Sequence, residues 1–300
     1  MLHHHYAVLD APSNLGLRQP APGIVPGCSK LPGALRDHGI VARLGAEDAG
    51  CVTAPRYDLR QWKPGDGVFN AAALAHYTQK LAERIGLLID RGRCPVVLGG
   101  DCSILLGAAL ALRRRGRYGL GFLDGHSDFR HPGNVPITQI GAAAGEDLAL
   151  VTGRGQRDLT DLEGRMPYVR DEDVAVLGIR DADECLAELR ELGVHVWEAG
   201  KVRSNGAPQT AKDALAHLED RARDGFWIHV DADILDPEVM PAVDSPDPCG
   251  LGHNHLAALL STLAASTRCI GIDIAVLDPD LDPTGALAGE LTNTVVRALT

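Results

Sequence analysis

The sequence predicts an α/β protein: a single domain of three layers (α/β/α), in which helices cover both faces of a mainly parallel β-sheet. Short apolar and β-branched segments alternate with amphipathic segments along the chain, and this alternation is typical of a parallel sheet with helical crossovers. The 300 residues are 45% hydrophobic, which suffices for a large core. No internal repeat or low-complexity tract interrupts them. We therefore expect one domain over residues 1–300.

The first elements have clear local signals. A strand at residues 6–10 leads into a Gly/Pro-rich loop, which could line a pocket or serve as a surface linker. A short helix follows at 31–38, whereas residues 46–66 carry no clear pattern. The strongest helix covers 70–93, where apolar side chains recur at three- and four-residue steps. The later elements are expected as strands at 94–98, 118–123, 174–179, 195–198, 226–230 and 269–275, and as helices at 103–115 and from Glu184, Pro208, His253 and Leu287.

Composition excludes several classes of protein. The formal charge is −11 and no block of Lys and Arg occurs, which argues against nucleic acid or an anionic membrane as a partner. The seven cysteines are odd in number and include no CxxC pair, so reduced thiols are expected. We see neither a signal peptide nor a run of about 18 apolar residues. His3, His4 and His5 fit either a natural metal-binding tract or a tag remnant. A cytoplasmic enzyme is the plain expectation.

Carboxylates at two strand ends suggest a metal site. Asp231 and Asp233 end an apolar run with i, i+2 spacing, which places both side chains on one face of a strand. Buried together they would repel each other unless a cation lay between them. Because Asp236-Pro237 follows, a turn-forming acidic cluster is the alternative.

A second strand end carries three possible ligands in a row. Asp124, His126 and Asp128 alternate directly after the strand at 118–123. Carboxylates with one imidazole suit Mn²⁺, Fe²⁺ or Zn²⁺ better than Ca²⁺, which takes oxygen ligands. Ligands bind outside the carboxyl ends of parallel strands, so both groups are expected at one edge of the sheet. Five such groups are enough for two metal ions.

These residues resemble the metal signatures of the arginase/agmatinase (ureohydrolase) family. The likeness extends from about residue 96 to 279 and implies a fold of the arginase/deacetylase type. Three motifs occur in the order of the family: Gly99-Gly100-Asp101-Cys102-Ser103, which differs from Gly-Gly-Asp-His-Ser at one position, Asp124-x-His126-x-Asp128, and Asp231-x-Asp233-x-x-Asp236-Pro237.

The resemblance implies a site for two Mn²⁺ ions. Asp124 and Asp231 would bridge the ions, Cys102 and Asp128 would complete one site, and His126 and Asp233 would complete the other. Such a pair lowers the pKa of a bound water, and the resulting hydroxide would attack a trigonal C–N carbon. Asp128 is therefore also a candidate catalytic residue.

Four further residues are candidates for substrate binding. Asp181 and Asp183 match acidic positions of the family, and the second helps to receive the amino group of the substrate in arginases. An ion pair of Arg180 with Asp181, and a helix N-cap at Asp183, are the alternatives. Arg130 replaces a small polar residue of the family and could bind a substrate carboxylate or close the pocket. Asn134 is the fourth candidate.

The chain departs from the family at three positions. Cys102 replaces a ligand histidine, and a softer thiolate favours Zn²⁺ or Fe²⁺ relative to Mn²⁺. Alternatively, Cys102 is only a small buried residue beside a weak metal site. Residues 138–143 align with the loop of a His-Gly pair whose histidine shuttles protons, and Ile140 occupies the histidine position. His131 could substitute for it, although a loop histidine is often only solvated.

The third departure lies after the last strand. In the family a glutamate pairs with the guanidinium there, and Val276 takes its place in this chain. A guanidinium buried without its carboxylate is costly. Asp278 could compensate if the loop is shifted, and we count it as a candidate catalytic residue.

The function expected is hydrolysis of a linear C–N bond in a small guanidino, amidino or amide molecule, with an amidine or guanidine hydrolase favoured. L-Arginine is expected to be a poor substrate because Ile140 and Val276 remove a general acid and an anion. Two alternatives stay open: a non-catalytic binding or regulatory protein, and an amide deacylase on the same fold. Family members are commonly trimers or hexamers, so a homo-oligomer is possible.

Overall fold

The computed structural model describes residues 4–221 and 224–300, and His3 lies outside them. Its centre is one sheet of eight parallel strands in the order β2-β1-β3-β8-β7-β4-β5-β6, which confirms the predicted fold class. The strands are β1 (Tyr6–Asp10), β2 (Glu47–Cys51), β3 (Cys94–Leu98), β4 (Gly119–Leu123), β5 (Val174–Leu177), β6 (His195–Trp197), β7 (Phe226–Asp231) and β8 (Cys269–Ala275).

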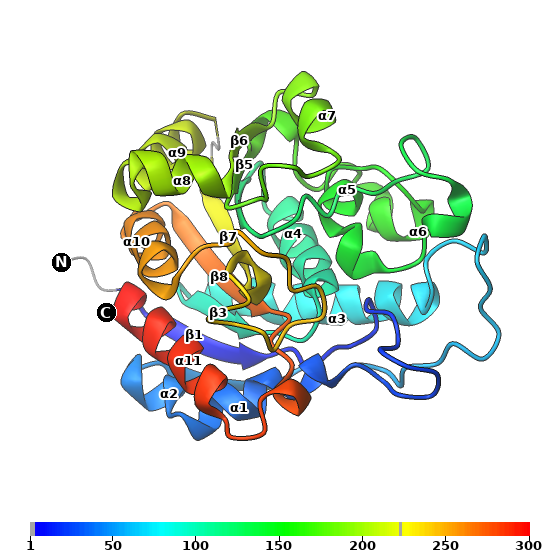
Figure 1. Ribbon diagram of the computed structural model, residues 1–300, viewed down its shortest axis with the longest axis horizontal. Helices are drawn as coiled ribbons and strands as arrows, with labels where there is room; N and C mark the ends of the chain where they lie inside the picture. Colours follow the sequence, from blue (N-terminus) through cyan, green and yellow to red (C-terminus); the bar gives the residue numbers. More distant parts are fainter. Residues whose placement is uncertain (1–3, 222–223) are drawn as a thin grey trace.

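Helices cover both faces of the sheet (Figure 1). One layer contains α3, α4, α5 and α6, and the other contains α1, α2, α9, α10 and α11. None of the helices in the described part of the chain is long and apolar enough to span a membrane. The helices are α1 (Leu31–Asp37), α2 (Ile40–Arg43), α3 (Ala71–Asp90), α4 (Leu105–Arg113), α5 (Asp147–Val151), α6 (Arg157–Thr160), α7 (Leu186–Glu191), α8 (Ala199–Asn205), α9 (Ala207–Arg221), α10 (His253–Ala264) and α11 (Ala286–Leu299).

The predicted elements are confirmed within a few residues, and the bounds of β3 and β8 agree fully. The central strands β3, β4 and β5 are buried at every residue, which explains their continuous apolar sequence. Strand β2 lies at the edge of the sheet and is mostly exposed, so its sequence Glu-Asp-Ala-Gly-Cys carries no apolar signal. For that reason it was not predicted. The short helices α2, α5, α6 and α8 were also missed.

The strand order brings the motif-bearing strands together. Strands β3, β8, β7 and β4 are neighbours in the middle of the sheet, and the predicted ligand residues follow three of them. Gly100 is required at the end of β3, because a Cβ there would lie 1.7 Å from the carbonyl oxygen of Ser13. The loop after β1 can therefore pack directly against the turn that carries Cys102.

Candidate metal centre

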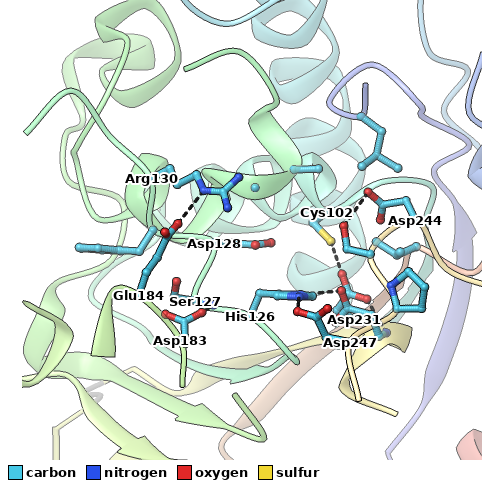
Figure 2. A pocket seen from close by; sticks show the side chains of 18 residues that line it. Cys102, His126, Ser127, Asp128, Arg130, Asp183, Glu184, Asp231, Asp244 and Asp247 are labelled. Atoms are coloured by element: carbon cyan, nitrogen blue, oxygen red, sulfur yellow. Dashed lines mark hydrogen bonds and ion pairs between the residues drawn. The ribbon is translucent and has the colours of Figure 1, made fainter. Parts of the chain in front are cut away.

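A cleft of about 370 Å³ opens at the carboxyl ends of the central strands (Figure 2). Most of its lining residues follow β3, β4 and β7 or belong to the loop that precedes α10. They are Leu17, Cys102, His126, Ser127, Asp128, Phe129, Arg130, Ala144, Gly145, Asp183, Glu184, Asp231, Asp233, Asp244, Ser245, Pro246, Asp247 and Val276. The polar character of this list fits a site for ions and small polar molecules.

Asp231 and Asp233 have a structural role as well as a place in the cleft. Asp231 is the last residue of β7, and its Oδ1 accepts a hydrogen bond from the backbone N of Asp233 at 2.7 Å. This bond caps a short 3₁₀ turn over Ala232–Ile234. The turn-forming interpretation is therefore correct for Asp231 Oδ1, while Oδ2 lies 2.6 Å from the Sγ of Cys102.

Three overlapping sets of side chains each place ligand atoms within 4.8 Å of one another: Asp124, His126 and Asp233; Cys102, Asp124, His229 and Asp231; and Cys102, Asp128 and Asp147. We call Asp124, His126 and Asp233 the outer group, because His126 reaches into the cleft and is partly exposed. The other two sets share Cys102, and together we call them the inner group. Its members are Cys102, Asp124, Asp128, Asp147, His229 and Asp231.

The outer group is held by internal hydrogen bonds. His126 Nδ1 lies 2.8 Å from Asp233 Oδ2, and His126 Nε2 lies 3.2 Å from Asp247 Oδ2. Burial alone would lower the pKa of His126, but the hydrogen bond and charge of Asp233 outweigh burial and raise this pKa to about 10. For Asp233, burial opposes ionisation, and the same bond from His126 lowers its pKa. The two side chains therefore form an ion pair.

The carboxyl groups around the inner group resist ionisation. Burial raises the pKa of Asp124, and the charges of Asp128 and Asp233 raise it further. Burial likewise raises the pKa of Asp128, Asp147 and Asp231, in each case with a further contribution from a neighbouring aspartate. The pKa of the Cys102 thiol is raised for the same two reasons. A divalent cation would remove this penalty, since it favours every ionised ligand.

Several buried atoms in this region have no hydrogen-bond partner within the described residues. They are Asp124 Oδ2, both carboxyl oxygens of Asp147, and His229 Nε2. Buried polar atoms are nearly always paired, and exceptions require an explanation such as an ion. A divalent cation with oxygen, nitrogen and sulfur ligands fits these atoms.

Asp147 and His229 were missed by sequence reasoning. His229 precedes Asp231 by two residues in β7, so strand alternation could have identified it. Asp147 begins the short helix α5 after a loop, and no motif marks it. Both side chains are fully buried.

Arg130 and Asp183 line the cleft, as the sequence suggested. Arg130 Nε donates to Glu184 Oε1 at 2.9 Å, and both side chains are more than half exposed. Asp183 accepts hydrogen bonds from the backbone N of Ser127 at 3.0 Å and of Cys185 at 2.8 Å. Asp183 thus holds the backbone at Ser127 in place, and its bond to Cys185 closes a tight turn.

Four other candidates lie outside the cleft. Asp181 accepts a hydrogen bond from the backbone N of Gly200, and Asp278 accepts hydrogen bonds from the backbone N of Gly27 and of Asp280. His131 Nε2 and Asn134 Nδ2 each contact the carboxylate of Glu188, and His131 Nδ1 accepts a hydrogen bond from Gly133. These contacts hold the surrounding loops together, and none of the four side chains is among the residues that line the cleft.

The alternative of an ion pair between Arg180 and Asp181 is not found among the described residues. The guanidinium of Arg180 instead donates to backbone carbonyl oxygens that follow β7, including those of Asp233 at 2.8 Å and Asp247 at 2.7 Å. Arg180 therefore positions the segment that carries Asp233.

The loop before α5 requires a correction. Ile140 is buried and does not line the cleft, whereas Ala144 and Gly145 do. The residues of this loop that face the cleft therefore lie four and five positions after Ile140, and neither has a proton-transferring side chain.

Val276 lines the cleft, as predicted for the position that follows β8. Its φ is 76°, which is a strained conformation for a β-branched residue. Its backbone N donates to the carbonyl oxygen of Gly100 at 2.7 Å, and this bond ties the loop after β8 to the turn after β3.

Comparisons with known proteins agree with this geometry. Residues 9–300 match the model of the Arginase family. The chain is 31% identical over 262 residues to the arginase of Brevibacillus brevis, covering 84% of this chain and 85% of that one. It is 29% identical over 283 residues to the arginase of Bacillus caldovelox, covering 92% of this chain and 91% of that one.

Solved structures show the same fold. The native structure of arginase from Bacillus caldovelox matches with a TM-score of 0.85 at 26% identity, covering 99% of this chain and 98% of that one. Formimidoylglutamase from Bacillus subtilis matches with a TM-score of 0.75 at 23% identity, covering 99% and 86%. Because the family model matches nearly the whole chain, this protein belongs to the arginase family.

Proposed function

We propose that the protein is a hydrolase of linear C–N bonds that uses two divalent metal ions and acts on an amidine or guanidine. The observation that carries this proposal is the set of buried, mutually repelling carboxyl groups at the base of the cleft. Membership of the arginase family supports the same reaction class.

The two groups of side chains divide the metal ligands. Asp124, His126 and Asp233 would hold the outer ion. Cys102, Asp128 and Asp231 would hold the inner one, with Asp124 and Asp231 placed between the two. When bound, such a pair lowers the pKa of water and polarises the carbon under attack. The protein orients these ligands through Arg180, which fixes the Asp233 segment.

The residues around the cleft favour a substrate less basic than L-arginine. A guanidinium is protonated at any working pH, so it needs an anion to hold it and a general acid for the leaving amine. Val276 and Ala144, which line the cleft, supply neither an anion nor a general acid. A neutral N-hydroxylated guanidine, acylated amidine or amide would suit this cleft better, and Arg130, which lines the cleft, would contact a substrate carboxylate.

Enzyme assays test both parts of the proposal. Release of urea or ammonia should be measured with L-arginine, agmatine and neutral analogues, with Mn²⁺, Zn²⁺ or Fe²⁺ supplied. We expect the neutral compounds to be turned over and Asp231→Asn to abolish activity. Turnover of L-arginine at about 1–10³ s⁻¹, the ordinary range of enzymes, would contradict the substrate assignment. A complete lack of turnover would favour the non-catalytic alternative.

A further inference from the structure

We propose that His229 and Asp147 are ligands of the inner metal ion, together with Cys102. This inference rests on the proposed function, since it names further ligands of the same metal centre. The imidazole ligand of this ion would then come from β7. The turn after β3 would supply the Cys102 thiolate in place of an imidazole.

The ring of His229 is held in one orientation. Its Nδ1 lies 2.5 Å from Asp273 Oδ2, and a carboxylate can only accept, so Nδ1 donates the hydrogen. Asp273 Oδ1 accepts from the indole nitrogen of Trp227. The ring of Phe122 stacks on the imidazole with centroids 5.0 Å apart. With Nδ1 protonated, Nε2 is available as a ligand, which is the arrangement of a carboxylate–histidine–metal triad.

The free nitrogen of His229 faces two carboxylates. Its Nε2 lies 4.0 Å from Asp124 Oδ2 and 4.0 Å from Asp147 Oδ2. A direct hydrogen bond would bring these atoms to about 2.7–3.2 Å. Atoms about 2.0–2.3 Å from one metal ion lie roughly 3–4.5 Å from each other, so the observed spacing leaves room for an ion.

The charge of the region argues for a cation instead of a water molecule. Asp124, Asp128, Asp147 and Asp231 are close together, and no lysine or arginine of the described residues forms an ion pair with any of them. A bridging water could satisfy the unpartnered atoms, but it brings no charge. A bound cation satisfies these atoms and also offsets the repulsion between the carboxylates when they are ionised.

The ligand set predicts different preferences at the two sites. A thiolate and an imidazole favour Zn²⁺ or Fe²⁺ over Mn²⁺ in the inner site. The outer site has two carboxylates and one imidazole, which accept Mn²⁺ more readily. The centre is therefore expected to bind one softer ion in the inner site before the outer site fills.

Zinc X-ray absorption tests the assignment directly. All variants also carry His3→Asn, His4→Asn and His5→Asn, so that the N-terminal histidines cannot contribute. In His126→Asn loaded with one Zn²⁺ per chain, His126 supplies no imidazole. We expect sulfur scattering at about 2.3 Å together with the imidazole pattern. His126→Asn/His229→Asn should lose the imidazole pattern and keep the sulfur.

Matched variants control for folding and for stray histidines. His126→Asn/His76→Asn changes an exposed histidine of α3 and should keep the imidazole pattern. Asp273→Asn keeps His229 but loosens its orientation, and competition titration should show zinc affinity lowered about 10- to 100-fold.

The outcomes separate the two proposals. Sulfur without imidazole in His126→Asn, or an unchanged affinity in Asp273→Asn, overturns the assignment of His229 and leaves the hydrolase proposal intact. A wild-type protein that binds neither zinc nor manganese overturns both. Asp147 is tested by Asp147→Asn, which should lower the zinc affinity of the inner site; an unchanged affinity removes it from the ligand set.

Discussion

The outer and inner groups of the metal centre contain similar residues but balance their charge differently. In the outer group, His126 is an ion-pair partner for Asp233 and also contacts Asp247. The inner group contains buried carboxyl groups whose nearest histidine, His229, is already engaged by Asp273. The His126–Asp233 part of the outer group can therefore exist without metal as an ion pair. The inner group must take up protons or bind a cation.

This difference connects stability, metal binding and pH. Carboxyl groups with raised pKa hold protons in the metal-free fold and release them when a cation binds. The inner group is thus expected to depend more strongly on metal than the outer group does. Four predictions sharpen or contradict this comparison.

The largest effect is expected on removal of metal. An ion at 100 times its dissociation constant stabilises the fold by about 2.7 kcal/mol, and two ions act together. Thermal unfolding with Zn²⁺ or Mn²⁺ should therefore occur at clearly higher temperature than with a chelator. Cys102→Ser should reduce this shift more for Zn²⁺ than for Mn²⁺. An identical melting temperature with and without metal would contradict the account.

The next prediction is that substitutions in the two groups change the free energy of unfolding in opposite directions. In metal-free protein at pH 8, Asp233→Asn breaks a buried pair and should lower the free energy of unfolding by about 3 kcal/mol. Asp147→Asn removes a buried, unpartnered carboxyl group and should raise it by about 1–3 kcal/mol. Urea unfolding with a chelator measures both. Changes of the same sign would show that the two groups are electrostatically alike.

Glu146 extends the comparison to pH. Burial raises its pKa from 4.5 to about 7, although Gly141 donates a hydrogen bond to it. The unfolded chain loses this proton at lower pH than the folded chain. The protonated Glu146 therefore makes its full contribution to the free energy of unfolding below about pH 4.5, and this contribution is lost as pH rises to 7. Glu146→Gln should therefore be neutral at pH 4 and stabilising by about 1–3 kcal/mol at pH 8. A pH-independent effect would contradict the assigned cause.

The smallest effect on stability is expected at the rim of the cleft. Arg130 and Glu184 form an exposed pair, and such pairs contribute about 0–1 kcal/mol. Arg130→Gln should leave the unfolding free energy nearly unchanged, while KM rises for substrates that carry a carboxylate. Arg60→Gln, at another exposed pair, is the matched control. An equal rise in KM for uncharged substrates would argue against a contact with the carboxylate.

Sequence reasoning succeeded where local patterns carry the information. The apolar runs of β3 and β8 and the two acidic motifs were recognised from neighbouring residues alone. It failed in the loops, where Ile140 was expected at the cleft but is buried, and His131 was considered for a cleft that it does not line. Loops lack a repeating period, so their register depends on the packing of the elements around them.

The sequence by itself determined the fold class and the presence of acidic strand ends, because helix and strand periods are properties of residues two to four apart. Only the tertiary structure decided which of these residues meet. Cys102 contacts Asp231 across 129 positions of the chain, and Asp147 reaches His229 from a different element. These contacts depend on strand order and on helix packing over the sheet, and the burial that results is what makes the inner carboxyl groups resist ionisation.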